Sequence, residues 1–178
     1  MKLIIIFIII TCSYSSLYSS ENRIILSGFT YHIDRTNDHG IKYNELNYGF
    51  GVEHNTREKN ENLYMNYKIM IIADSYEKPF PFISVGGEYK LNTLPLAFSL
   101  DVFSGIKHLG KKYALDENGD YYIKSGTYKP ILGLAPSIKL FIKDVSVNLS
   151  YSPEVIVKNK YLKLHPPAFF YMTFGYKI

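Results

Sequence analysis

Two short segments of the chain carry side chains that together could transfer an acyl group. The first contains His32, and the second contains Asp74 and Ser75 directly after a run of apolar residues. A histidine can take the proton from an attacking hydroxyl, and a carboxylate can orient the imidazole or stabilise its cation. Serine and aspartate are also common turn residues, so spacing alone leaves the three groups either catalytic or structural. Catalysis would require a fold that brings the two segments together.

The segments around these residues alternate between apolar and polar side chains. In residues 45–53 every second side chain is apolar, and the same pattern occurs in 63–73, 96–102 and 170–178. Such a period of two predicts strands. Eight strands can be placed, each about ten residues long, which is the length that a tilted strand needs to cross a bilayer. They cover roughly 23–33, 43–54, 62–73, 81–91, 95–106, 129–141, 145–152 and 168–178.

This pattern predicts an all-β fold, an eight-stranded antiparallel transmembrane β-barrel of the outer-membrane type. Closure leaves no strand edge facing lipid, and lipid-facing apolar residues alternate with lumen-facing polar ones. A soluble lipocalin-like barrel fits the same alternation with the two faces exchanged. Aromatic residues near the strand ends and connections of alternating length favour the membrane barrel. The longer connections, including 107–128 and 153–167, would face outward, on the rim that also receives His32, Asp74 and Ser75.

The first twenty residues have the form of an export signal. A positive start is followed by an uncharged apolar run and then by small polar residues, as in a secretory signal peptide. The apolar run is too short for a membrane-spanning helix. A lipoprotein signal ending at Cys12 is the alternative. We therefore expect a signal peptide at 1–20 and one exported domain, at 21–178, in the outer membrane.

Composition excludes several other classes of protein. The chain has 178 residues, one Cys, no Trp and a formal net charge of +4. One Cys excludes an intramolecular disulfide framework and a zinc site built mainly of Cys. The small charge excess, without a block of Lys or Arg, gives no indication of a nucleic-acid partner. No cluster has metal-ligand spacing, so no metal site is expected. The 17 Tyr and 11 Phe would suit a lipid-facing surface.

Three separated segments carry motifs that are specific when taken together. The segments are Phe29-Thr30-Tyr31-His32 followed by Tyr43-Asn44-Glu45 and Gly49-Phe50-Gly51, then Ala73-Asp74-Ser75-Tyr76-Glu77-Lys78-Pro79-Phe80-Pro81, and last Ser150-Tyr151-Ser152-Pro153. They resemble the lipid A palmitoyltransferase family (PagP), whose members are eight-stranded outer-membrane barrels. The pairing of Asp-Ser with a distant histidine is the specific part of the resemblance.

The resemblance implies an activity and a set of site residues. It implies that His32, Asp74 and Ser75 form the catalytic group, with Ser75 either the nucleophile or a polar stabiliser. Gly86 would lie at the floor of an acyl-chain cavity, and Pro153 at a gap between strands through which lipid enters. The implied reaction moves a palmitoyl-like chain from a phospholipid donor to lipid A at the outer leaflet. A monomer without a cofactor would perform it.

Three other functions remain open at this point. A small barrel without enzymatic activity, acting in adhesion or membrane integrity, explains the alternation and the export signal equally well. A lipid A or phospholipid deacylase would use the same side chains and release free fatty acid to water. A soluble lipocalin-like carrier would be found outside the membrane, unlike the other candidates.

Overall fold

The structure is a computed structural model that describes residues 20–33, 43–58, 62–115, 121–153, 157–159, 162–164 and 168–178. The regular structure in these ranges is β throughout, and no helix in them is long and apolar enough to cross a membrane. All but the last residue of the predicted signal peptide lies outside the described residues. The strands are β1 (Ser20–His32), β2 (Gly49–Arg57), β3 (Leu63–Ala73), β4 (Pro79–Lys90), β5 (Leu96–Leu115), β6 (Tyr121–Ile142), β7 (Val145–Ser152), β8 (Val157–Asn159), β9 (Leu162–Leu164) and β10 (Phe169–Lys177).

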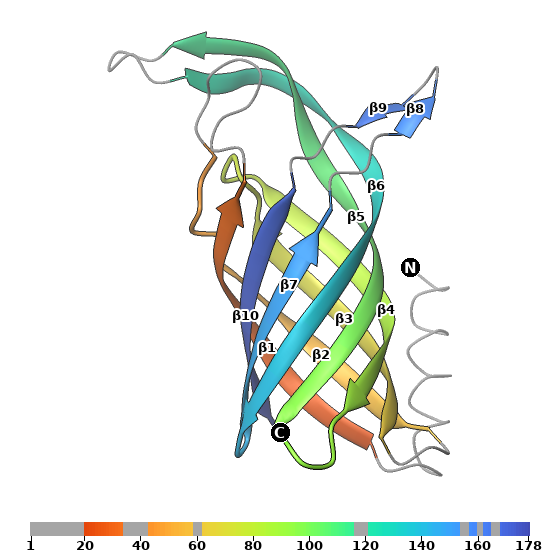
Figure 1. Ribbon diagram of the computed structural model, residues 1–178. Coiled ribbons are helices and arrows are strands. Elements are labelled where there is room, and N and C mark those ends of the chain that lie inside the picture. The colour runs from red at the N-terminus through yellow and green to blue at the C-terminus, as the bar shows by residue number, and fades with distance from the viewer. Residues whose placement is uncertain are drawn as a thin grey trace, which may run out of the picture.

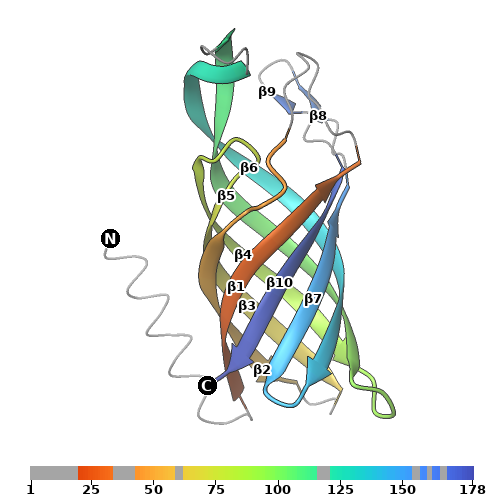
Figure 2. The ribbon, with the colours of Figure 1, turned by 90° about the vertical axis from the view of Figure 1, so that its left-hand side faces the viewer.

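Eight of these strands form one closed antiparallel barrel (Figures 1 and 2). Their order is β1-β10-β7-β6-β5-β4-β3-β2, and β1 pairs with both β2 and β10. Closure leaves no barrel strand with a free edge. The eight-stranded antiparallel barrel predicted from the alternation is therefore confirmed. The remaining strands, β8 and β9, form a small separate hairpin.

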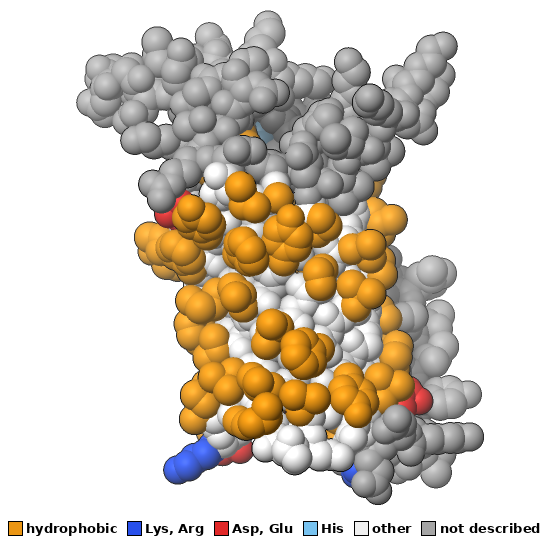
Figure 3. All heavy atoms as spheres, viewed as in Figure 1, with side chains coloured by type: hydrophobic (Ala, Val, Ile, Leu, Met, Phe, Trp, Pro, Cys, Tyr) orange, Lys and Arg blue, Asp and Glu red, His pale blue; other side chains and the backbone are white. Residues whose placement is uncertain are grey.

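The outer wall of the barrel is apolar. Along β1, Ile24 and Leu26 are exposed while Arg23 and Ser27 are buried. The same alternation continues around the barrel, and apolar side chains cover most of the height of the wall in Figure 3. A soluble lipocalin-like barrel has the opposite arrangement, with its apolar residues inside.

The barrel interior has an apolar part and a charged part. The apolar part lies toward the end of the barrel where β1 and β3 finish. It contains Ile25, Met70, Ile72 and Phe80, with Phe82, Phe103, Ile131 and Tyr171 packed against them.

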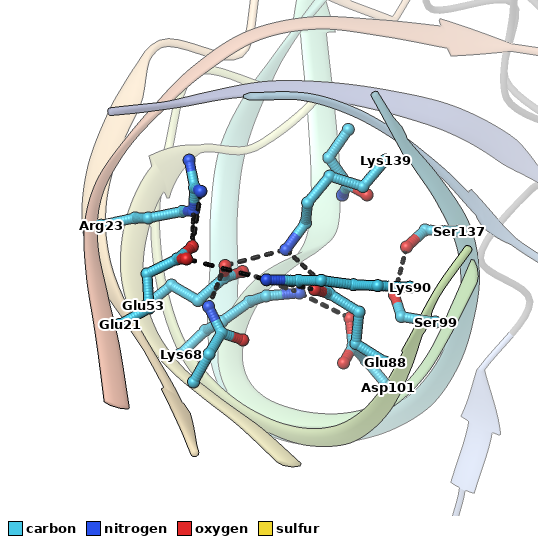
Figure 4. A network of polar contacts seen from close by, with 12 residues as sticks. Glu21, Arg23, Glu53, Lys68, Glu88, Lys90, Ser99, Asp101, Ser137 and Lys139 are labelled. Carbon is cyan, nitrogen blue, oxygen red and sulfur yellow. Dashed lines mark hydrogen bonds and ion pairs between the residues drawn. The ribbon is translucent and has the colours of Figure 1, made fainter. Parts of the chain in front are cut away.

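The opposite end of the interior holds a network of ion pairs (Figure 4). Lys139 Nζ lies 2.8 Å from Glu53 and 2.5 Å from Glu88, and Lys68 Nζ lies 2.7 Å from Asp101. All five side chains are buried. A buried charge is tolerated when it is paired and hydrogen-bonded, so the network allows charged residues to fill this part of the barrel.

Several predicted boundaries are wrong: β1 begins at Ser20, and the expected loop 153–167 contains β8 and β9. Two further differences affect the rim of the barrel. Residues 43–48 are not part of β2, because Asn44 bonds through its side chain to the backbone N–H and C=O of Leu46, at 3.0 and 3.1 Å. Such local bonds compete with strand pairing. Residues 107–128, expected as a loop, instead continue the β5–β6 ladder as far as Leu115 and Tyr121. β5 and β6 pair with each other along this extension without needing a third strand. The hairpin can therefore rise beyond the barrel (Figure 1).

Candidate functional site

His32 and Ser75 meet at one rim of the barrel. His32 is the last residue of β1, and Ser75 lies in the turn between β3 and β4. The His32 Nε2 and Ser75 Oγ atoms are 2.8 Å apart and share a hydrogen bond. Both side chains are buried, with exposed fractions of 1% and 7%. The parallel directions of β1 and β3 carry the two residues to the same end of the barrel.

The segment 43–48 fills the space between these two strands above the start of β2. Thr30 of β1 donates its backbone N–H to Glu45, at 2.8 Å, and Asn44 donates its own to the carbonyl of Ser75, at 2.9 Å. Ala73, the last residue of β3, also bonds to the segment through the carbonyl of Tyr48, at 2.7 Å. The irregular segment thus ties the His32 strand to the Ser75 turn.

Aromatic rings hold the imidazole of His32 in place. Tyr43 stacks on it with ring centroids 4.4 Å apart and an interplanar angle of 22°, and Phe169 lies 5.7 Å away. The other ring nitrogen, Nδ1, is buried without a hydrogen-bond partner among the described residues. When Nε2 accepts the Ser75 hydroxyl proton, Nδ1 carries the ring's own proton. This pair has the geometry of a general base and the hydroxyl that it activates.

Asp74 shapes the turn that presents Ser75. Its Oδ1 accepts the backbone N–H groups of Tyr76 and Lys78, both at 2.9 Å. Its own N–H donates to the Lys78 carbonyl at 2.7 Å. Within the described residues, no hydrogen bond or ion pair joins Asp74 to His32. The carboxylate therefore acts on Ser75 through the backbone of the turn.

Lys107 is a further charged residue at the site, which the sequence prediction missed. Lys107 lies close enough to His32 and to Asp74 to interact electrostatically with both. The predicted fifth strand ends at residue 106, one residue before Lys107. Asp101 and Gly105 face inward, and every second residue of a strand faces the same side. Continuing the strand by two residues beyond Gly105 would have placed Lys107 on the inner face.

No known protein family matches this chain, and no curated protein matches its sequence. The basis for assigning a function is therefore the geometry of the site. Among the described residues, no group of three or more His, Cys, Asp or Glu side chains could hold a metal ion.

Gly86 lies on the inner face of β4 against the ion-pair network. In register it is opposite Asn66 on one side and Asp101 on the other. A Cβ atom added at Gly86 would lie 2.0 Å from Asp101 Oδ1 and 2.5 Å from the Leu100 carbonyl oxygen. The missing side chain thus makes room for Asp101. That Gly86 also limits the depth of an acyl chain stays a prediction.

Pro153 directly follows β7, where strand pairing is incomplete. In the described part of the chain, the β6–β7 ladder runs only from the Ile142–Val145 pair to the Ser137–Ser150 pair. On its other side, β7 remains paired with β10 up to Ser152. The last residues of β7 therefore have no partner on β6. Pro136, next to the end of that ladder, has no N–H to extend it.

Proposed function

We propose that this protein is an outer-membrane acyltransferase that moves a palmitoyl-like chain from a phospholipid to lipid A. The hydrogen bond between His32 and Ser75 at the barrel rim carries the proposal. It supplies a base and a hydroxyl, which are the groups that acyl transfer needs. Export through the signal peptide at 1–20 and action as a monomer belong to the same proposal.

The apolar outer wall supports a membrane location. In a bilayer every backbone polar group must be paired within the protein, and a closed barrel meets this requirement. The exposed Ile, Leu, Val and aromatic side chains would face lipid tails, while charged groups are enclosed. In water, the same wall would be an apolar patch far larger than monomeric soluble proteins expose.

Two reaction courses use the His32–Ser75 pair. In the first, His32 takes the Ser75 proton, the Ser75 oxygen attacks the donor ester, and lysophospholipid leaves with that proton. A lipid A hydroxyl, deprotonated by His32, then takes the acyl group from Ser75, and the proton on His32 returns to the released Ser75 oxygen. In the second, His32 deprotonates the lipid A hydroxyl, whose oxygen attacks the donor ester directly, and His32 then gives that proton to the departing lysophospholipid oxygen. The Ser75 hydroxyl donates to the developing oxyanion. In both, Asp74 positions Ser75 by closing the turn.

The interior next to the rim has the polarity that a fatty acyl chain requires. The apolar residues around Met70 and Phe80 lie between the rim and the ion-pair network. A chain inserted among them would be stopped by the charged groups, because going deeper would separate buried ion pairs and leave charges without their partners. The short β6–β7 ladder near Pro153 offers the weakest part of the wall for a lipid to enter sideways.

A phospholipid or lipid A deacylase is the second candidate, favoured by the same His32–Ser75 geometry with water as the acceptor. Product analysis separates the candidates. The purified protein would be placed in vesicles that contain lipid A and a phospholipid with a labelled acyl chain. Labelled lipid A would support the transferase, and labelled free fatty acid alone would identify a deacylase. Absence of both products would leave a barrel without enzymatic activity.

A further inference from the structure

Two lysines lie directly opposite each other on the inner wall beside the site. Lys107 of β5 is the register partner of Lys129 of β6. Directly opposed residues in an antiparallel ladder point to the same face, with Cβ atoms about 4.5–5.5 Å apart. That face is the inner one, because Gly105 is buried two residues before Lys107, and Ile131, two residues after Lys129, packs against the apolar interior.

The pair places two lysine side chains next to the catalytic residues, in a part of the wall where Lys107 is partly buried. The Lys107 charge interacts with His32 and Asp74. No ion pair within the described ranges joins Lys107 or Lys129 to a carboxylate. Asp74 brings one negative charge, and its Oδ1 already accepts two backbone N–H groups. Among the described residues, Asp74 is therefore the carboxylate whose interaction with Lys107 is established.

Like charges placed directly opposite each other in a sheet destabilise it. An anion between them would remove the repulsion. Lysine binds phosphate well as a compact charge with three donors, and a phosphate diester carries a single negative charge.

We propose that Lys107 and Lys129 bind the phosphate of the donor phospholipid. This inference rests on the proposed function, since it assigns the donor's headgroup. The glycerol carbons alone separate that phosphate from the acyl esters, so a phosphate held by the lysines leaves an ester within reach of Ser75 and His32. The alkyl chain of the same lipid then continues into the apolar interior.

Lipid retention measured by native mass spectrometry tests this assignment without requiring catalysis. The full mature protein would be released from nanodiscs that contain equal amounts of phosphatidylglycerol and of diacylglycerol with the same chains. We expect the wild type to retain phosphatidylglycerol preferentially, and Lys107→Met with Lys129→Met to reduce that preference roughly tenfold or more. Each single substitution should cause part of the loss.

Lys143→Asn is the matched control. It removes a lysine from the opposite end of the barrel, at a turn residue with φ 56° that asparagine tolerates. Its lipid preference should equal that of the wild type. Heat-dependent gel mobility would verify that every variant is folded.

Three outcomes would overturn the proposal. They are equal retention of the two lipids by the wild type, an unchanged preference in the folded double variant, and displacement of phosphatidylglycerol by inorganic phosphate at comparable concentration. The last result would mean a site for free phosphate instead of a lipid headgroup. A preserved preference without acyl transfer would contradict the proposed function alone, and acyl transfer without a preference would contradict the lysine assignment alone.

Discussion

His32 and Ser75 are hydrogen-bonded to each other although a whole strand, β2, separates β1 from β3 in the sheet. The contact is possible because β2 begins only at Gly49 and leaves the rim to the segment 43–48. Tyr43 of that segment stacks on His32, and Asn44 bonds to the backbone of Ser75. The late start of one strand therefore creates the site.

Replacing either member of the pair should abolish transfer. His32→Ala removes the base and Ser75→Ala removes the hydroxyl, and we expect each to reduce the rate roughly a hundredfold or more. His54→Ala is the control, because His54 lies on β2 and bonds to Asn22 at the other end of the barrel. The measurement is the initial rate of lipid A acylation in vesicles. Equal losses in His32→Ala and His54→Ala would count against a specific role for the rim.

Two substitutions at Asp74 distinguish the role of its negative charge from the role of the hydrogen bonds that it accepts. Asp74→Asn keeps the Oδ1 acceptor for Tyr76 and Lys78, so it should retain most of the activity. Asp74→Ala loses both bonds, and we expect it to lower the free energy of unfolding by about 1–3 kcal/mol and to reduce activity strongly. Denaturant unfolding and initial rates measure the two effects. Activity as low in Asp74→Asn as in Asp74→Ala would show that the negative charge itself is required.

Gly86 and Gly87 form a matched pair for substitution. Gly86→Ala places a Cβ against Asp101, whereas one at Gly87 meets nothing within 4 Å. We expect Gly86→Ala to destabilise the barrel by about 1–3 kcal/mol and Gly87→Ala to change stability little. Urea midpoints of the two variants provide the comparison. Equal midpoints would mean that Asp101 moves freely and that Gly86 is not needed to hold the network together.

Gly133 offers a probe of the apolar interior. A Cβ at this position would lie 2.3 Å from the Phe103 ring, so Gly133→Ala should push that ring into the space proposed for the acyl chain. The transferred chain should then become shorter, as read from the mass distribution of acylated lipid A. Leu132→Ala, on the exposed outer wall, is the control. An unchanged chain length in Gly133→Ala would place the chain elsewhere.

Lys139 should be essential for stability. Lys139→Met leaves Glu53 and Glu88 buried without their strongest partner, and removal of one member of a buried ion pair typically costs about 3–5 kcal/mol. Denaturant unfolding in detergent measures the loss. Lys177→Met, which removes a half-exposed lysine near Glu21, should cost far less. Similar values for the two lysines would contradict a structural role for the network.

Alternation predicted the barrel because the period of two is a local property of each strand. His32 and the Asp74–Ser75 turn could be placed at one rim, since strand direction and strand count suffice for that. The stacking of Tyr43 on His32 could not be predicted, because it depends on the irregular backbone that the Asn44 side chain stabilises.

The separation of the interior into apolar and charged parts could not be predicted from the sequence pattern either. Glu53, Lys68 and Lys139 come from three different strands, and their pairing depends on the stagger of those strands around the barrel. Alternation places each side chain inside without giving its height. For the same reason the contact of Gly86 with Asp101 required the three-dimensional register.

The mass spectrum of lipid A from cells with an outer membrane, expressing either the wild type or His32→Ala, is the most direct measurement. We expect a lipid A species heavier by one fatty acyl group with the wild type, and its absence with the variant at equal membrane abundance. An unmodified spectrum with the folded wild type, or the heavier species at full level with His32→Ala, would contradict the proposal that the His32–Ser75 pair transfers an acyl chain to lipid A.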